Sequence, residues 1–230
     1  GPEIVESVAE HANALIFALA HRVVETDKFT RAGKYHGWGP KLLLGSDVSG
    51  KTLGVIGTGR IGKGLIKRMY DGFGVKIIYN NISRDKALEK KYKAKYRTKM
   101  QLLKEADFVS LHVPLLDSTR HLISTKELKA MKKTAFLINT SRGPVIDELA
   151  LTKALKRGEI GGAGLDVYEC EPLTDCNPRD SYQLRKLSNV VLTPHTASAT
   201  VETRQAMSRV AAKNILAFLD GKRPPNRITK

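Results

Sequence analysis

The stretch Lys51-Thr-Leu-Gly-Val-Ile-Gly57-Thr58-Gly59-Arg60-Ile61-Gly62 decides the fold of this chain. Its apolar start is typical of a buried strand, and the apolar residues after it recur at helical spacing, at Ile61, Leu65, Met69 and Phe73. Gly57 permits a tight turn, Gly59 lets a pyrophosphate approach the backbone, and Gly62 lets the helix pack closely on the strand. Alone, Gly-x-Gly-x-x-Gly indicates only a glycine turn. Between a strand and a helix N-terminus it predicts dinucleotide binding through Gly57, Thr58, Gly59, Arg60, Ile61 and Gly62.

Short apolar runs and helical patterns alternate along the rest of the chain. The runs predict six buried strands, at 53–56, 75–79, 108–113, 135–138, 162–165 and 190–192. Among the helix candidates, Ser124 and Glu127 have capping-box spacing, and Asp147 begins a helix that stops at Gly158. This alternation predicts an α/β fold, a doubly wound parallel sheet of the Rossmann NAD(P)-binding type. Its ligand crevice is expected at the carboxyl ends of the strands.

The first 50 residues differ in pattern from the rest. Between residues 3 and 30 apolar side chains recur at three- and four-residue steps, which predicts an N-terminal helical arm. Residues 33–50 carry five glycines and Pro40 around Trp38, which predicts an irregular connection. We therefore expect one dinucleotide-binding domain over residues 1–230, with the arm and connection in 1–50 and the Rossmann core and a C-terminal helix in 51–230. The chain opens Gly1-Pro2 without an initiator Met, so we take this start as the cleavage scar of an excised domain.

Composition narrows the function classes. The 230 residues are 41% hydrophobic, and 39 Lys and Arg against 23 Asp and Glu give a net charge of +16, which attracts phosphate-bearing partners. The densest apolar run, 14–20, is much shorter than the roughly 18 to 20 residues that cross a bilayer, so we expect no membrane partner. Cys170 and Cys176 are too few for a disulfide framework, and no secretory signal is visible. A reducing cytoplasm is the expected location.

The end of the second strand bears on the choice of cofactor. A carboxylate there would bind the adenosine ribose of NAD, but the chain has Asn80 and Asn81. The absence of that carboxylate removes repulsion against a 2′-phosphate, and Arg84 and Lys86 follow closely. We therefore expect NADP or NAD, with NADP favoured, and with Asn81 and Arg84 in the binding site. The alternative is that these are only solvated loop residues of a basic protein.

Four further stretches, together with the glycine motif, resemble the motifs of one known family. They are Leu111-His-Val-Pro-Leu115, Asn139-Thr-Ser-Arg142-Gly143, Gly164-Leu-Asp166-Val-Tyr-Glu-Cys-Glu171-Pro172 and Thr193-Pro-His195-Thr-Ala-Ser198. Five motifs in the same order, nearly end to end, make the chain resemble the D-isomer-specific 2-hydroxyacid dehydrogenases. Within that family it resembles the branch of glyoxylate or hydroxypyruvate reductases and phosphoglycerate dehydrogenases.

The resemblance implies an NAD(P)-dependent enzyme and assigns roles to residues. It places the substrate-anchoring arginine on Arg142, the catalytic histidine on His195 and its acid partner on Glu171. These residue types suit reduction of a small 2-oxo acid, because Arg142 can bind the carboxylate and His195 can protonate the carbonyl oxygen. Glu171 would orient His195 and favour its imidazolium form. The resemblance also assigns to the cofactor Val113, Pro114, Thr140, Ser141, Arg142, Asp166, His195, Ala197 and Ser198, with Asp166 at the nicotinamide.

The resemblance has one large gap, because members of the family carry a substrate domain that this chain lacks. Without it one wall of the cleft is missing, so the isolated domain could bind cofactor and yet be inactive. The family arrangement also implies a homodimer formed with the arm and connection, and the apolar face of residues 5–19 offers a surface for it.

Two other interpretations of the sequence remain open. Corepressors that resemble this family use the same fold as a cofactor-sensing interaction module. The basic run Lys90-Lys-Tyr-Lys-Ala-Lys-Tyr-Arg-Thr-Lys99 with its interleaved tyrosines suggests nucleic-acid binding, although no groove-reading element is visible and we expect no specific nucleic acid. No metal is expected, because the remaining histidines have no ligand partners at useful spacing.

Overall fold

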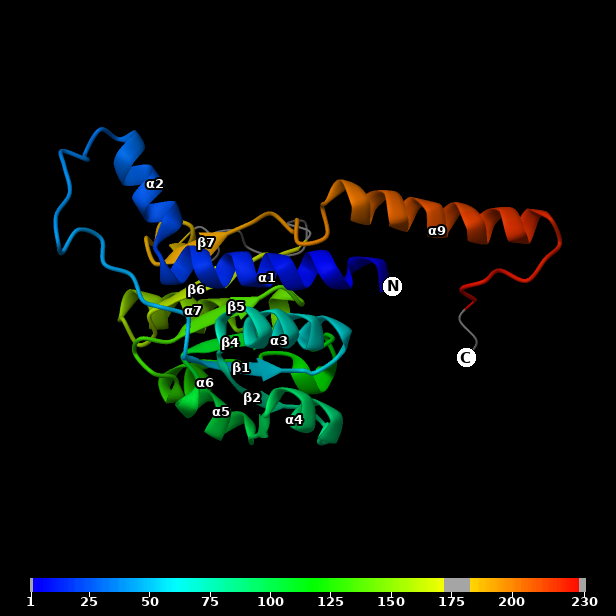
Figure 1. Cartoon of the computed structure of the whole chain (residues 1–230), viewed down its shortest axis with the longest axis horizontal. Coiled ribbons are helices and arrows are strands. Elements are labelled where there is room, and N and C mark those ends of the chain that lie inside the picture. The colour runs from blue at the N-terminus through cyan, green and yellow to red at the C-terminus, as the bar shows by residue number, and fades with distance from the viewer. Residues whose placement is uncertain (1, 172–182, 228–230) are drawn as a thin grey trace.

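The centre of the molecule is a parallel β-sheet. The computed structural model describes residues 2–171 and 183–227. Within them the sheet has seven strands in the order β3-β2-β1-β4-β5-β6-β7 (Figure 1). They are β1 (Thr52–Ile56), β2 (Lys76–Asn80), β3 (Lys95–Tyr96), β4 (Phe108–Leu111), β5 (Phe136–Asn139), β6 (Gly162–Leu165) and β7 (Val190–Leu192). The order reverses between β1 and β4, which is where such sheets open a ligand crevice. The predicted fold class is confirmed.

Helices cover both faces of this sheet. In the described residues they are α1 (Val5–Ala20), α2 (Val23–Arg31), α3 (Arg60–Phe73), α4 (Lys86–Tyr92), α5 (Lys99–Glu105), α6 (Thr125–Ala130), α7 (Glu148–Lys156) and α9 (Val201–Leu219). Helices α1 and α3 share one core with alternate strand residues such as Val55, and α5, α6 and α7 share the other with residues such as Ile56. Burial on both faces explains why the strands are continuous apolar runs.

The caps read from the sequence are present. Ser124 and Glu127 form the capping box that begins α6, and the Asp147 carboxylate accepts the N–H of Ala150 at 2.9 Å at the start of α7. Past the end of α7, Gly158 has a φ of 63°, which suits glycine.

The edge strand β3 was missed by the sequence analysis, because it lies inside the basic run 90–99 and has no apolar pattern. The tyrosines of that run are structural. Tyr92 is buried, and Tyr96 packs edge to face on Tyr79 with ring centroids 5.6 Å apart. Two lysines of the run, Lys90 and Lys91, lie in the last turn of α4, where cations complement the negative end of a helix.

The N-terminal arm differs from the prediction in two ways. It is two helices, because Arg22 takes a left-handed conformation with φ 54° between α1 and α2. The apolar face of residues 5–19, which we expected to be free for a second copy, is buried against this chain's own sheet. The connection 33–50 contains no helix or strand, as predicted. Figure 1 shows α2 with the connection and α9 projecting from opposite ends of the domain.

The helices and the cysteines bear on two predictions made from composition, the absence of a membrane span and of a disulfide framework. No helix in residues 2–171 and 183–227 combines the length and the apolar character that a bilayer crossing requires. Cys170 is disulfide-bonded, which the small number of cysteines did not lead us to expect, and Cys176 lies outside the described residues.

Two glycines of α3 provide a matched test of the strand–helix contact. A Cβ on Gly62 would lie 2.3 Å from the carbonyl oxygen of Gly57, whereas one on Gly72 would meet no atom within 4 Å. We expect Gly62→Ala to lower the free energy of unfolding by about 1 to 3 kcal/mol through overpacking. Gly72→Ala should raise it by up to about 1 kcal/mol, because alanine has the higher helix propensity. Urea denaturation of both variants measures this, and equal effects would contradict the role of Gly62.

Candidate active site

A cleft of about 490 Å³ opens at the carboxyl ends of the strands. This volume falls within the roughly 300 to 1,000 Å³ of small-molecule sites. The predicted site residues that line it are Ile61, Val113, Pro114, Thr140, Ser141, Arg142, Asp166, His195, Ala197 and Ser198. Ile4, Val8, His112 and Leu115 also line it and were not predicted. The loops after β1, β4, β5, β6 and β7 therefore meet in one place.

The glycine motif forms a cradle at the edge of this cleft. Gly57 has a φ of 93°, and a Cβ there would lie 2.5 Å from the carbonyl oxygen of His112. Gly59 is the N-cap of α3, and a Cβ on it would meet nothing within 4 Å. Gly57 and Gly62 are thus required by close packing, whereas Gly59 leaves an open face beside a helix N-terminus. This is the arrangement that binds a phosphate.

Two hydroxyl groups support the fit of a dinucleotide. Among the described residues, Thr58 Oγ1 and Thr140 Oγ1 are buried and have no hydrogen-bond partner. Buried polar atoms are normally paired, so unpaired ones in a cleft point to a polar ligand. The open face of Gly59 and these two unpaired hydroxyls are features that a bound dinucleotide would occupy and satisfy.

The residues predicted to select the cofactor lie at the end of β2 and just after it, outside the lining of the cleft. Asn80 Nδ2 donates to the carbonyl of Arg97 at 2.7 Å. Arg84 forms a two-pronged ion pair with Glu89, at 3.0 and 2.8 Å. Glu89 also accepts a hydrogen bond from the hydroxyl of Tyr79 at 2.7 Å. Its pairing with Arg84 lowers the pKa of Glu89, with Tyr79 as a second cause. Arg84 therefore follows β2 closely, as a contact to a 2′-phosphate requires, but its guanidinium already has an acidic partner.

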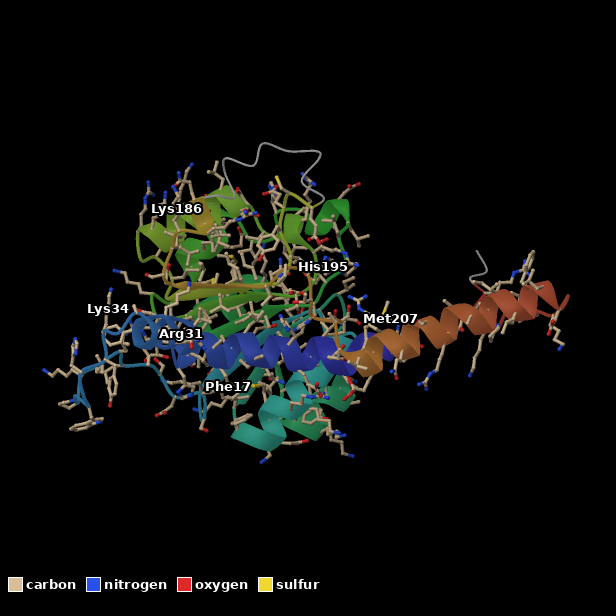
Figure 2. The ribbon with its side chains drawn as sticks, turned by 90° about the horizontal axis from the view of Figure 1, so that it is seen from above. Phe17, Arg31, Lys34, Lys186, His195 and Met207 are labelled. Atoms are coloured by element: carbon tan, nitrogen blue, oxygen red, sulfur yellow. The ribbon has the colours of Figure 1, made fainter. Side chains whose placement is uncertain are left out.

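The three predicted catalytic residues follow three adjacent strands. Arg142 follows β5, Glu171 follows β6 and His195 follows β7. His195 Nδ1 contacts Glu171 Oε1, although the two residues lie 24 positions apart in sequence. Arg142 is exposed and donates from Nη1 to the carbonyl of Ser141 at 2.6 Å. Figure 2 shows His195 near the end of the domain from which α9 projects.

Asp166 is fully buried, and both its oxygens accept hydrogen bonds from within the chain. Oδ1 accepts the N–H of Thr196 and Oδ2 accepts the N–H of Ala197, each at 2.9 Å. Burial raises the pKa of Asp166, but hydrogen bonds from His11, Thr193 and these two amides outweigh it, so the pKa is lowered. Asp166 therefore stays ionised, and it holds the loop that carries His195 in addition to facing the cleft.

Three features around the site were not predicted. His121 Nε2 lies 2.5 Å from Glu169 Oε1, and Glu169 Oε2 accepts the N–H of Glu148 at 3.2 Å. These contacts fasten the loop that leads to Glu171, and no local signal indicates them. A Cβ on Gly143 would lie 1.7 Å from the carbonyl oxygen of Tyr168, so glycine after Arg142 is required by the same loop.

His112 is the third feature that was not predicted, and it lies in the motif Leu111-His-Val-Pro-Leu115. Its Nε2 lies 2.9 Å from Ser110 Oγ. Burial lowers its pKa from 6.5 to about 4, so it is neutral at physiological pH. A position directly after a buried strand was the signal that could have found it.

Known proteins similar to this chain belong to the family whose motifs it resembles. A family model described as "D-isomer specific 2-hydroxyacid dehydrogenase, NAD binding domain" matches residues 13–197. The chain is 48% identical over 228 residues to a glyoxylate reductase of Korarchaeum cryptofilum, covering 99% of this chain and 67% of that protein. It is 50% identical over 231 residues to a glyoxylate reductase of Thermococcus litoralis, covering 99% and 68%.

Solved structures agree with these relatives. The TT0316 protein from Thermus thermophilus superposes with a TM-score of 0.89 at 42% identity, covering 99% of this chain and 69% of that one. The NAD-complexed D-isomer-specific 2-hydroxyacid dehydrogenase from Lactobacillus delbrueckii ssp. bulgaricus gives 0.84 at 33% identity, covering 100% and 70%. The chain thus spans about two thirds of the length of these proteins. Their names give no support to the cofactor-sensing alternative.

The neutral state of His112 predicts a pH dependence of stability. Between pH 6.5 and 4 the unfolded chain binds a proton at this residue and the folded chain does not, so the free energy of unfolding falls as the pH falls. A shift of this size corresponds to about 3 kcal/mol. We expect His112→Gln, which stays neutral, to remove most of this loss in urea denaturation between pH 7.5 and 4. His36→Gln, in the exposed connection, is the control, and an unchanged slope in His112→Gln would contradict the assignment.

Proposed function

The chain belongs to the D-isomer-specific 2-hydroxyacid dehydrogenase family, as the NAD-binding domain of an NAD(P)-dependent oxidoreductase, and from this premise we propose that it serves the reduction of a small 2-oxo acid. The observation that supports this most is the contact of His195 with Glu171, beside Arg142 in the cleft that the glycine cradle borders. The relatives named glyoxylate reductase favour glyoxylate as substrate, and the resemblance of the motifs adds hydroxypyruvate.

In this proposal each catalytic residue has a distinct role. The planar guanidinium of Arg142 binds the carboxylate of the 2-oxo acid. His195 donates a proton to the carbonyl oxygen as general acid. Since its Nδ1 faces Glu171, Nε2 is the atom that carries the transferred proton, and the Glu171 carboxylate orients the ring. The nicotinamide, when bound, supplies the hydride to the carbonyl carbon.

The atoms and electrons balance in both directions. The C=O π bond breaks, and one C–H and one O–H bond form, so the 2-oxo acid is reduced to a 2-hydroxy acid and the nicotinamide is oxidised. His195 is left neutral and takes a proton back from solvent. In the oxidative direction neutral His195 removes the hydroxyl proton as general base.

For the cofactor, we propose that the backbone of Gly57, Thr58, Gly59, Arg60, Ile61 and Gly62 binds the pyrophosphate at the N-terminus of α3. The nicotinamide side is assigned to Val113, Pro114, Thr140, Ser141, Asp166, Ala197 and Ser198. NADP(H) is preferred over NAD(H), because Asn80 and Asn81 bring no negative charge that would repel a 2′-phosphate, and the cationic Arg84 follows them closely in sequence. The pairing of Arg84 with Glu89 reduces this preference, since binding a 2′-phosphate competes with an existing partner.

The assembly is also a proposal. We propose that a further segment, corresponding to the part of the relatives that this chain does not span, supplies a second wall of the cleft, and that the 230 residues alone bind cofactor and turn over poorly. Exposed apolar side chains favour a homodimer, formed by α2, the connection and α9 rather than by α1. They are Val23, Tyr35, Trp38, Leu44, Ile215, Leu216, Phe218 and Leu219. A cytoplasmic location and the absence of a specific nucleic-acid partner or a metal stay predictions.

The catalytic assignment is tested in an enzyme that also contains the segment of the relatives that this chain does not span. We expect His195→Ala to lower kcat/KM for glyoxylate about 10²- to 10⁴-fold, because the proton donor is lost. The affinity for NADPH should stay within a factor of about two. Steady-state kinetics and cofactor titration measure the two quantities, and Glu171→Gln should give a smaller loss. Undiminished turnover in His195→Ala would disprove the mechanism.

The cofactor preference is tested on this chain by calorimetric titration with NADPH and NADH. We expect tighter binding of NADPH, and we expect Arg84→Ala to weaken NADPH about tenfold by removing a charge-assisted contact while leaving NADH unchanged. Lys90→Ala, which removes an equal charge from the end of α4, is the control. Tighter binding of NADH would overturn the proposed preference for NADP(H) and would leave the family assignment unchanged.

A further inference from the structure

The loop that carries His195 has an unfavourable backbone conformation. His195 has a φ of 55°, in the left-handed region that residues with a Cβ rarely adopt. Such a conformation is strained and persists only where the surroundings hold it. The structure around His195 must therefore contain groups that fix this loop.

Asp166 supplies those groups to three successive amides. Its backbone carbonyl accepts the N–H of His195 at 2.9 Å. Its carboxylate oxygens accept the N–H groups of Thr196 and Ala197, each at 2.9 Å. The orientation of the His195 loop thus depends on the position of one buried carboxylate.

That carboxylate is held in turn by Thr193 and His11. Thr193 Oγ1 donates to Asp166 Oδ1 at 2.5 Å. His11 Nε2 lies 2.9 Å from Thr193 Oγ1 and 3.4 Å from Asp166 Oδ1. The hydroxyl has one proton, and the carboxylate can only accept, so Thr193 must use its proton on Asp166. His11 is therefore the donor to Thr193, and its Nε2 carries a proton.

His11 brings this chain of hydrogen bonds to a fixed element. It belongs to α1, whose Leu15 and Leu19 pack on Gly164 of β6 so closely that a Cβ on that glycine would lie 3.0 Å from Leu15 Cβ. On the other side, Ala9 would lie 3.2 Å from a Cβ on Gly64 of α3. Helix α1 therefore cannot shift or rotate freely, and neither can the donor atom of His11.

We propose that His11 is a positioning residue, which fixes the loop of His195 from α1 through Thr193 and Asp166. The hydrogen bonds from His11 to the loop do not depend on the proposed function. Only the conclusion that they position a proton donor rests on the proposed role of His195. The relay spans 182 residues between His11 and Thr193, so displacement of α1 would be transmitted to the backbone of the proton donor.

The test measures the hydrogen exchange of the Thr196 and Ala197 amides by NMR in the ¹⁵N-labelled chain. We expect exchange at both amides to be at least about tenfold faster in His11→Leu, because loosening the carboxylate lets these hydrogen bonds open more often. In His11→Gln the side-chain amide can replace Nε2–H, so exchange should return to within about threefold of the parent chain. His21→Leu removes a histidine that stacks on Phe17 at the end of the same helix, and it should have no effect. Unchanged amides in His11→Leu, or no rescue in His11→Gln, would overturn the proposal.

A second variant separates the relay from a general loss of structure. Thr193→Val preserves shape and removes the middle link, so it should accelerate the same two amides. In the double variant His11→Leu/Thr193→Val the acceleration should be clearly smaller than the product of the two single effects, because both changes disrupt the same set of contacts on Asp166. Multiplicative effects, or equal acceleration of the β4 and β5 amides, would show that His11 acts elsewhere. These readouts do not depend on turnover, so failure of the proposed reaction would be seen separately, in the kinetics of His195→Ala.

Discussion

The close approach of α3 to β1 is the constraint on which the rest of the structure depends. The carbonyl of Gly57 leaves no room for a side chain on Gly62, so the helix begins directly at the end of the strand. Its N-terminus then faces the point where the strand order reverses. Because every strand is parallel, the loops after β4, β5, β6 and β7 reach the same edge of the sheet. The glycine cradle and the predicted catalytic residues are brought together by topology before any individual side chain is considered.

The same topology accounts for part of the positive charge. Three helices between parallel strands, α5, α6 and α7, end at the edge opposite the cleft, and their last turns carry Lys104 in α5, Lys129 in α6, and Lys153 and Lys156 in α7. Cations there offset the partial negative charge of helix C-termini. The net charge of +16 is thus partly a structural property of the fold. This weakens the argument from charge to nucleic acid, as does the packing of Tyr92 and Tyr96 into the domain.

The sequence predicted what depends on local pattern and missed what depends on distant contacts. Six strands, the capping box of α6 and the N-cap of α7 follow from periodicity and short-range spacing. The two-residue strand β3 has no apolar pattern of its own. The break between α1 and α2 was not predicted, because it depends on the left-handed backbone conformation of Arg22, for which the apolar spacing gives no signal. In the site, resemblance to known motifs selected the residues that line the cleft. It could not show that Arg84 is paired with Glu89 or that His121 contacts Glu169, because partner choice depends on how the loops fold.

The contacts around Asp166 explain why a buried charge and a strained backbone occur together. Each is unfavourable alone, since an ionised carboxylate loses its hydration and a left-handed histidine is strained. Their combination reduces both costs: the left-handed turn at His195 points the N–H groups of Thr196 and Ala197 at the carboxylate, and these donors replace water. A neutral side chain at position 166 would remove the reason for the turn, and an extended backbone at position 195 would leave the carboxylate unsolvated. The loop of His195 is therefore specified by a mutual electrostatic requirement, and its geometry follows from the position of Asp166 at the end of β6.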